Sequence, residues 1–506
     1  MKNKFQHSIS FILAALILSG TAAGMVSCST DNENAESTSA QTEQTEASTE
    51  PLGESAVAVL RKNTKDTLPE DLDLGGAVMR VVSRVGSQGV RMEFTAESST
   101  GDIIEDAVYR RNMAVEERLN TKLQIIPVEA PQGDGGQINS LISRSVSGGL
   151  DEYDIVSNHM SQITPQLVRG LYYDLHTLPY LDFEKPWWNQ SYNDCATIFD
   201  KQFACAGELG MTMLSGMYVV FYNQKLYDSM YSENLYDVVT DGKWTLDAMA
   251  EFCKGMYRDL NGNAAADDAD QFGLALSVSA MGPDSFVSGA DLTFTEYDDA
   301  NDTYVWALEN ERTAAFLEKI THLVHENNNT CNVDNSNKFL NDTALFHSGM
   351  LEVAFELRDM ESDFGVLPMP KVDETQDGYT TWAHNGFSVF AIPTTCGQAE
   401  YAAAFMEAMC AETYRSVTAD YFDVAMKVKY TRDERAAEVL DMISQNIIFD
   451  FGYVFNESIS SYATDIFRTM LFDKSKCQAG MSTIAAAETA ANNKLQNIIN
   501  KYAALE

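Results

Sequence analysis

Apolar and polar residues follow two alternating patterns along the chain from about Gly75 onward. Short runs of β-branched and aromatic residues predict strands, whereas apolar residues at every third or fourth position predict amphipathic helices. In the first part of this region the predicted strands are residues 79–83, 123–128 and 153–157, and the predicted helices are residues 102–119, 138–146 and 163–171. Because strands that alternate with helices form parallel sheets with right-handed crossovers, this order predicts an α/β fold.

The remainder of the chain continues the mixed pattern and then becomes helical. Its predicted strands are residues 217–222, 272–277, 351–355, 364–366 and 387–392, and its predicted helices include residues 312–326, 399–410, 433–446 and 482–502. Thr245 is placed to cap a further helix, because a threonine hydroxyl accepts a hydrogen bond from the first helical turn.

Polar residues follow two of the predicted strands. Ser83 and Arg84 end the first strand, and Asn158 and His159 follow the third. Ligands of parallel sheets bind outside the carboxyl ends of the strands, where such side chains form hydrogen bonds. We therefore predict that Asn158 and His159 contact a ligand.

The N-terminus has the parts of a secretory signal, namely a basic start, an apolar run at residues 9–18 and a small-residue exit. The apolar run is too short for a stable membrane-spanning helix. Residues 25–28 (MVSC) resemble a bacterial lipobox, in which the cysteine becomes the lipidated first residue of the mature protein. We predict a signal peptide at residues 1–27 and a lipid anchor on Cys28. The alternative is an ordinary signal with a chance cysteine.

Residues 29–50 have the composition of a flexible tether. They include no lysine, arginine or aromatic residue, so they cannot bury enough apolar surface to offset the entropy of ordering. Since folded structure is expected to begin near Gly75, the predicted tether spans residues 28–74. A lipid anchor followed by a tether would hold a folded body at the extracellular face of the cell membrane.

The composition excludes several classes of partner. The 506 residues include 35 Lys and Arg against 74 Asp and Glu, which gives a formal net charge of −39. Such acidity argues against nucleic-acid binding and against adsorption to an anionic membrane, because both need clustered basic residues. The protein is expected to contact a membrane only through its anchor. The 45% of hydrophobic residues are sufficient for a large folded core.

Seven cysteines follow Cys28, and none forms a Cys-x-x-Cys pair. This spacing favours neither a zinc site nor a thioredoxin-like redox site. Cys195 and Cys205 could close a small loop, or they could be buried as small hydrophobic residues.

Several motifs occur in a fixed order between residues 75 and 455. They are residues 101–112 (GDIIEDAVYRRN), 115–120 (VEERLN), 185–188 (KPWW), 220–224 (VFYNQ), 241–247 (DGKWTLD), 270–274 (DQFGL), 358–361 (RDME) and 364–371 (FGVLPMPK). Together they resemble the extracellular solute-binding proteins of bacterial ABC importers, the family that includes maltose-binding protein, and most closely a clostridial lipoprotein subset. One departure is Gln224, which stands where the family usually has lysine.

The resemblance implies a two-lobe periplasmic-binding-protein-like fold of type II, with a multi-strand hinge and a ligand in the cleft. By analogy, lobe one would comprise residues 75–212 and 353–395, and lobe two would comprise residues 213–352 and 396–506. The implied function is capture of a carbohydrate, and an oligosaccharide in particular, for delivery to the permease subunits of an ABC transporter. We expect a monomer.

Tryptophans and one arginine are further candidate ligand contacts. Sugars present apolar C–H faces beside hydroxyl groups, so sugar-binding clefts combine aromatic rings with polar side chains. Trp187, Trp188 and Trp382 lie in polar, loop-like sequence, whereas Trp244 and Trp306 are expected in the core. Another candidate is Arg358, which could reach the cleft or form a salt bridge at the hinge.

Residues 259–270 (DLNGNAAADDAD) resemble a calcium-binding loop. The candidate ligands are Asp259, Asn261, Asn263, Asp267 and Asp270. A calcium ion needs six to eight oxygen ligands on a tight loop, which this spacing supplies. Two positions depart from the pattern, because Ala264 replaces glycine and Asp270 replaces a bidentate glutamate. The alternative is a hydrogen-bonded acidic turn. A bound calcium would be structural, and no cofactor is required.

Enzyme signatures are missing from the sequence. It has no Gly-x-Ser-x-Gly elbow, phosphate-binding loop, dinucleotide fingerprint or His-Glu-x-x-His motif. His322, His325 and Glu326 are expected on a helix surface rather than at a metal. We therefore predict a binding protein. The alternatives are a surface-anchored glycoside hydrolase or lyase, whose paired carboxylates need no sequence motif, and a binding protein for another solute such as a peptide.

Overall fold

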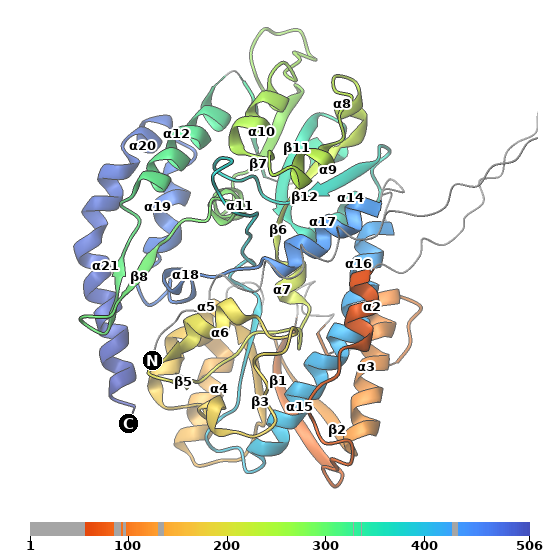
Figure 1. The fold of residues 1–506 in the computed structure, drawn as a ribbon, viewed down its shortest axis with the longest axis vertical. Helices are drawn as coiled ribbons and strands as arrows, with labels where there is room; N and C mark the ends of the chain where they lie inside the picture. Colours follow the sequence, from red (N-terminus) through yellow and green to blue (C-terminus); the bar gives the residue numbers. More distant parts are fainter. Residues whose placement is uncertain are drawn as a thin grey trace, which may run out of the picture. The chain divides into compact units, whose positions relative to one another are not determined.

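A computed structural model describes residues 56–85, 93–94, 98–129, 136–326, 328–334, 336–427 and 434–505. The predicted signal peptide, the predicted lipid anchor at Cys28 and the first part of the predicted tether lie outside the described residues. The described chain contains two main β-sheets with helices around them (Figure 1).

The first sheet has four strands in the order β13-β3-β1-β2. These strands are β1 (Ala77–Val85), β2 (Thr121–Glu129), β3 (Ile155–His159) and β13 (Ser388–Ala391). β1 pairs in parallel with β2 and with β3, and β13 pairs with β3 in the antiparallel direction. The crossover helices are α3 (Ile103–Leu119) and α4 (Gly136–Ser147), so the predicted α/β alternation is confirmed.

Helix α3 shows how local sequence defines an element. The Asp102 side chain accepts hydrogen bonds from the backbone N–H groups of Ile104 and Glu105, which caps the first turn. Asn120 ends the helix in the left-handed conformation (φ 47°), which asparagine tolerates better than most residues. The helix packs against β2 and α15 (Ala399–Glu412). Its buried side chains recur at helical spacing: Ile104, Ala107, Val108, Arg111, Asn112, Val115 and Leu119.

The second sheet has five strands in the order β10-β7-β11-β6-β12. They are β6 (Tyr218–Asn223), β7 (Phe272–Ser277), β10 (Thr330–Val333), β11 (Ala344–Met350) and β12 (Phe364–Leu367). Every residue of β6, β7 and β11 is buried. The largely apolar sequences of β6 and β7 predict this burial, whereas β11 includes His347 and Ser348 and was not predicted as a strand. Helices α10 (Leu246–Cys253), α11 (Met281–Gly289) and α12 (Glu311–His325) pack around this sheet, and Thr245 caps α10 as predicted.

The remaining elements are short or lie towards the C-terminus. They are α5 (Met160–Ile163), η3 (Thr164–Arg169), η4 (Leu175–Thr177), α6 (Gln190–Ala196), β4 (Thr197–Ile198), β5 (Lys201–Gln202), α7 (Thr212–Ser215), α8 (Gln224–Asp228), α9 (Leu235–Thr240), β8 (Thr295–Asp298), β9 (Thr303–Trp306), α13 (Asn337–Leu340), η5 (Leu351–Val353), α14 (Ala354–Leu357), α15 (Ala399–Glu412), η6 (Thr413–Val417), α16 (Thr418–Lys427), α17 (Glu434–Gln445), α18 (Phe451–Val454), α19 (Tyr462–Met470), α20 (Lys474–Gln478) and α21 (Gly480–Ala503).

Two predictions about residues 351–395 differ from the structure. Residues 351–355 belong to η5 and α14 rather than to a strand. β12 pairs with β6 in the second sheet, with Leu367 opposite Val220, whereas residues 353–395 were expected in lobe one. Only the end of that segment, β13, joins the first sheet. Apolar pattern predicts that a strand is buried, but pairing partners depend on the tertiary fold.

The C-terminal part of the chain divides between the two sheets, although all of residues 396–506 were expected in lobe two. Helix α15 packs against α3, and its apolar residues join the core beneath the first sheet. Helix α17 instead packs against β12, and α19 and α20 pack against α11 and α12 around the second sheet. The chain therefore passes between the sheets three times, before β6, before β13 and before α17.

The three crossing segments lie side by side and are joined by backbone hydrogen bonds. Met217 bridges Ala383 in the antiparallel direction, and Thr381 bridges Ile447 in the parallel direction. The N–H of Thr381 donates to Asn446 O at 3.1 Å, and the N–H of Ile448 donates to Thr381 O at 2.9 Å. We refer to these three paired segments, which connect the two sheets, as the hinge.

Folded structure begins earlier than the predicted boundary at Gly75. Residues of the predicted tether form α2 (Ala56–Asn63), and Leu68 and Leu74 are buried in the core beneath the first sheet. Arg61 of α2 forms a buried ion pair with Glu208 at 3.2 Å. This segment has too few apolar residues to show a periodic pattern in the sequence. Its folded structure becomes apparent only from its contacts with residues far away along the chain.

The seven cysteines of the described chain are free, and all but Cys195 are buried. The interpretation as small buried hydrophobic residues is confirmed for Cys205, and no disulfide joins it to Cys195. Within the described ranges no helix is both long and apolar enough to cross a bilayer.

Candidate ligand-binding site

A cavity of about 380 Å³ lies between the carboxyl ends of β3 in the first sheet and β7 in the second. Its lining residues come from both sheets and from the hinge: His159, Ser161, Gln162, Ser279, Ala280, Met281, His384, Asn385 and Glu457. The volume falls within the range of small-molecule sites, and clefts between two bodies are common places for them.

His159 is the first sheet's contribution from the end of β3. It pairs with Ser388 of β13, and the next residue, Met160, begins α5 with its N–H bonded to Phe387 O at 2.9 Å. The His159 side chain is only 5% exposed, and its Nε2 has no hydrogen-bond partner among the described residues. Because burial and the nearby Arg84 and His384 disfavour a second proton, the pKa of His159 falls to about 3. Its ring is neutral and has an unused polar atom.

Arg84 lies buried next to this histidine. Its Nη2 donates to Gly386 O at 3.0 Å and to Ser388 Oγ at 2.8 Å, which links the end of β1 to the start of β13. Burial lowers the pKa of Arg84 to about 10, and the buried carboxylate of Glu93 opposes that shift. The guanidinium therefore stays charged at neutral pH and holds the floor of the cavity in place.

His384 is the hinge's contribution. Its backbone N–H donates to Gly216 O at 2.9 Å, which fixes two of the crossing segments to each other. Its Nδ1 accepts from the N–H of Gly386 at 3.2 Å, so the neutral ring carries its proton on Nε2. Burial, together with the positive charges of Arg468 and Arg84, lowers the pKa of His384 to about 4.

The second sheet contributes the turn between β7 and α11. Ser279 Oγ lies 2.8 Å from Ser277 Oγ, so the turn presents a hydroxyl pair at the strand end. Asp284 of α11 is buried and accepts from Arg468 Nε at 2.9 Å, which joins α11 to α19. The cavity combines neutral imidazoles, hydroxyls and amides with the exposed carboxylate of Glu457. These groups can donate and accept hydrogen bonds with an uncharged, hydroxyl-rich ligand.

Comparisons with solved structures show the same architecture. A maltose/maltodextrin-binding domain from Bdellovibrio bacteriovorus bound to maltotriose has 14% identity and a TM-score of 0.50, and the match covers 83% of this chain and 100% of that one. A sugar transporter structure from Rhizobium etli in an open conformation has 13% identity and a TM-score of 0.55, covering 82% and 99%. The maltose-binding protein MalE from Listeria monocytogenes in complex with maltose has 12% identity and a TM-score of 0.52, covering 83% and 98%.

The chain has the two-lobe, type II solute-binding fold. No protein-family model and no curated protein sequence matches the chain. Lobe one is the part of the molecule built on the first sheet, and lobe two is the part built on the second sheet.

The tryptophans predicted as ligand contacts are buried in lobe one and at the hinge. Trp187, Trp188 and Trp382 are each at most 3% exposed, and none of them lines the cavity. Trp188 Nε1 donates to the buried Glu407 at 2.9 Å, and Trp382 stacks on Tyr453. The polar sequence around these residues suggested exposure, but their large rings are packed in the core instead. Trp244 and Trp306 are buried as predicted.

The other two predicted ligand contacts also lie outside the cavity. Asn158 is fully buried, and its side chain accepts from the N–H of His159 and donates to Asn139 Oδ1 at 3.1 Å. It therefore supports the end of β3, while His159 alone among the six predicted residues lines the cavity. Arg358 is exposed just after α14.

Besides Ser161 and Gln162, which follow His159 in α5, three groups of cavity residues were not predicted. Ser279 follows β7. It would have been indicated if the preference of ligands for the carboxyl ends of strands had also been applied to the second sheet. His384 and Asn385 lie on a hinge segment, and Glu457 follows α18. Irregular segments have no periodic signal, so the sequence offered no means to place these three residues.

The predicted calcium loop is closed by its own hydrogen bonds. Asp259 accepts from the N–H groups of Gly262 and Ala264, and the amides of Asn261 and Asn263 donate to Asp267. Asp270 is buried and accepts from Leu260 N at 3.0 Å. Ala264 takes the left-handed conformation (φ 59°) that the usual glycine would provide. Within the described ranges no group of three His, Cys, Asp or Glu side chains is arranged to hold a metal, so calcium binding stays a prediction.

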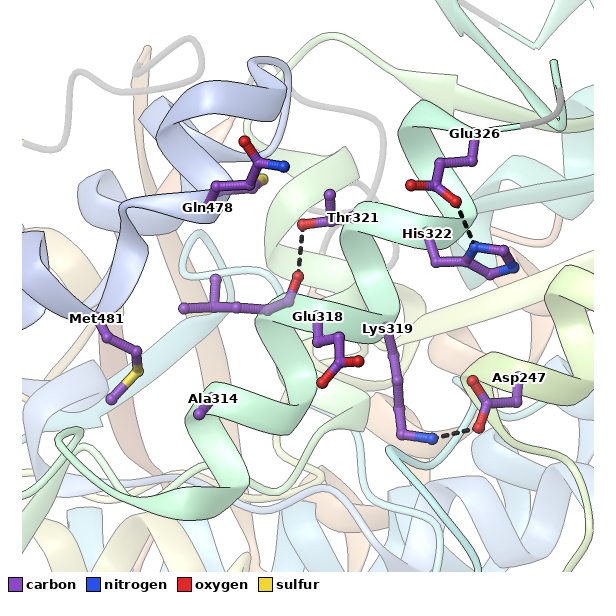
Figure 2. A pocket seen from close by; sticks show the side chains of 11 residues that line it. Asp247, Ala314, Glu318, Lys319, Thr321, His322, Glu326, Gln478 and Met481 are labelled. Carbon is purple, nitrogen blue, oxygen red and sulfur yellow. Dashed lines mark hydrogen bonds and ion pairs between the residues drawn. The ribbon is translucent and has the colours of Figure 1, made fainter.

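A separate cavity of about 710 Å³ lies on lobe two, between α12 and the region of α20 and α21 (Figure 2). Figure 2 shows Lys319 of α12 directed at Asp247 of α10, and His322 Nδ1 lies 2.8 Å from Glu326 Oε2. The histidine is exposed, as predicted. Since only lobe two lines this cavity, a ligand there would not contact both lobes.

Proposed function

We propose that the protein is a lipid-anchored extracellular solute-binding protein that captures a carbohydrate by hinge closure for ABC-type import. The observation that carries the proposal is the 380 Å³ cavity, which both lobes and the hinge line and in which a buried, neutral histidine, His159, has an unused polar atom. The hydroxyls, imidazoles and amides around it suit a hydroxyl-rich ligand. Similarity to solved proteins described as binding maltotriose or maltose supports the same ligand class.

The proposed mechanism is a shift between open and closed states. A ligand that contacts Ser279 and His159 at once would bind lobe one and lobe two together, and it would therefore favour the closed arrangement. The hydrogen bonds between Gly216 and His384, and between Thr381 and Ile448, keep the crossing segments together while the lobes rotate. The closed, loaded form would be recognised by the permease, and the ligand would leave unchanged.

The main test is calorimetry of the mature protein against a panel of mono- and oligosaccharides, with solution scattering before and after saturation. We expect binding of at least one saccharide and a smaller radius of gyration in its presence. Tight binding of a peptide with no binding of any saccharide would overturn the carbohydrate assignment. Release of reducing sugars from a polysaccharide by the purified protein would instead support the alternative of a surface-anchored hydrolase or lyase.

The lipid anchor is tested independently of the ligand. Cells that express the full chain would incorporate a labelled fatty acid into the protein, and Cys28→Ala would abolish the label and release the protein into the medium. Serine at position 27 offers a matched control, because Ser27→Ala keeps a small residue before the cysteine. Membrane retention of the Cys28→Ala protein would contradict this part of the proposal.

A further inference from the structure

A second groove on lobe one adjoins the candidate ligand cavity. It has a volume of about 790 Å³, and its lining residues come from α4 on one side and from α5 and η3 on the other. Gln162 lines both the groove and the cavity, so the two spaces meet at this side chain. Asn139 of α4 donates to Gln162 O at 2.8 Å, which holds the two walls together at the junction. A ligand longer than the cavity would continue into the groove.

The groove is uncommonly basic for this acidic chain. Its described lining includes two arginines and no carboxylate: Gly136, Asn139, Ser140, Ser143, Arg144, Ser147, Gly148, Gln162, Gln166 and Arg169. The cavity on lobe two provides a contrast, because Asp247, Glu318 and Glu326 line it. Although the chain has a net charge of −39, the described residues that line the groove next to the candidate site include no carboxylate.

The Arg169 side chain is held in position by uncharged groups. Arg169 Nη1 donates to Gln166 Oε1 at 2.6 Å, and its Nη2 donates to Ser143 Oγ at 3.1 Å. Both acceptors are uncharged, and the second bond crosses from η3 to α4. Neither Arg169 nor Arg144 has an ion pair within the described ranges, unlike Arg61, Arg80 and Arg468, which are paired with acids. A guanidinium group whose hydrogen-bond acceptors are uncharged keeps its positive charge, and it has further N–H donors for an anionic partner.

We propose that the groove between α4 and η3 binds an acidic group of the ligand, and that the ligand is an oligosaccharide carrying carboxylate, sulfate or phosphate groups. This inference rests on the proposed function. One saccharide unit would occupy the cavity at His159, and the chain would pass Gln162 into the groove, where Arg144 and Arg169 hold the anionic substituent. The hydroxyl, imidazole and amide groups of the cavity would bind the hydroxyls of the ligand, and the arginines of the groove would bind its anionic group.

The test uses pairs of oligosaccharides that differ only in charge. The probes are oligogalacturonate and its methyl ester, a sulfated oligosaccharide and its desulfated form, and a phosphorylated oligosaccharide and its dephosphorylated form. Calorimetry at low and high salt measures each pair with the wild-type protein, Arg144→Gln, Arg169→Gln and the double variant. The control is Arg110→Gln, which removes an exposed arginine of α3 that pairs with Asp420 instead of lining the groove. Thermal unfolding confirms that each variant is folded.

We expect one anionic member to bind at least tenfold more tightly than its neutral partner, with affinity that falls as salt rises. Each groove variant should lower that affinity about tenfold and leave the neutral partner unchanged, and Arg110→Gln should change neither. The pair that responds identifies the anionic group. If neutral forms bind as tightly as anionic forms, or the groove variants change nothing, the inference is overturned while the proposed function stands. If no saccharide of either kind binds, the proposed function fails and this inference fails with it.

Discussion

The indole ring of Trp382 stacks on the phenol ring of Tyr453 with the ring centroids 4.1 Å apart and the planes inclined by 29°. Trp382 belongs to the hinge segment between β12 and β13, and its carbonyl accepts from the N–H of Tyr218 at 3.1 Å. Tyr453 belongs to α18 and donates its hydroxyl to Ala383 O at 3.0 Å. The contact therefore attaches α18 to the hinge, and the ring packs in the interior instead of facing a ligand.

Replacement of Trp382 by alanine should destabilise the fold. A buried aromatic ring replaced by a methyl group leaves a cavity, which typically costs about 3–5 kcal/mol in the free energy of unfolding. Trp382→Phe retains an aromatic partner for Tyr453 and should cost distinctly less. Urea unfolding followed by circular dichroism measures both variants. A Trp382→Ala protein as stable as the wild type, but unable to bind a ligand, would show that the ring is a ligand contact after all.

The unused Nε2 of His159 leads to a prediction about affinity. His159→Ala should weaken saccharide binding at least tenfold, because a hydrogen bond that the closed cavity provides would be lost. His322→Ala is the matched control, since this exposed histidine lies in the cavity confined to lobe two. Calorimetry with the best-binding saccharide compares the two variants. Equal affinities for both would place the ligand elsewhere.

Glu407 predicts a pH dependence of stability. Burial between the tryptophans of lobe one raises the pKa of Glu407 to about 7, although Trp188 Nε1 donates to its carboxylate. Between pH 4.5 and about 7, the Glu407 carboxyl group therefore stays protonated in the folded state, whereas it is ionised in the unfolded state. The stabilising contribution of this proton is present below pH 4.5 and is lost as the pH rises towards 7.

Glu407→Gln should remove this dependence, because glutamine is neutral at every pH and its amide oxygen can still accept from Trp188. At pH 8 the variant should be more stable than the wild type by an amount on the order of 3 kcal/mol, and at pH 4 the two should be similar. Urea unfolding at a series of pH values measures the difference. A difference that does not change between pH 4 and pH 8 would contradict the pKa assigned to Glu407.

The loop at residues 259–270 leads to a calcium prediction. If Asp259, Asp267 and Asp270 bind calcium, millimolar calcium should raise the melting temperature of the protein relative to EDTA, because a ligand of the folded state alone stabilises that state. Asp267→Asn should abolish the increase, and Asp377→Asn, at an exposed position outside the loop, should preserve it. Magnesium serves as a further control. Equal melting temperatures in calcium and in EDTA would leave the loop as a hydrogen-bonded turn.

The sequence by itself determined much of the local structure and indicated one residue that lines the candidate site. Helix α3 follows from Asp102, its apolar stripe and Asn120, since capping and amphipathic spacing act within a few residues. His159 was found from the sequence because the carboxyl ends of parallel strands are where such sheets bind ligands. The resemblance carried by ordered motifs also predicted the two-lobe fold, which the structural comparisons show.

Only the tertiary structure decided which elements share a lobe and which side chains meet. The apolar sequence of β12 predicts that this strand is buried. Its pairing with β6 involves residues that lie more than a hundred positions away in the sequence. Likewise, the polar surroundings of Trp187 suggested exposure, whereas α15 covers that region of lobe one. His384 reaches the cavity because three crossing segments converge at the hinge. Local sequence encodes which faces are apolar, and long-range packing selects the partner for each face.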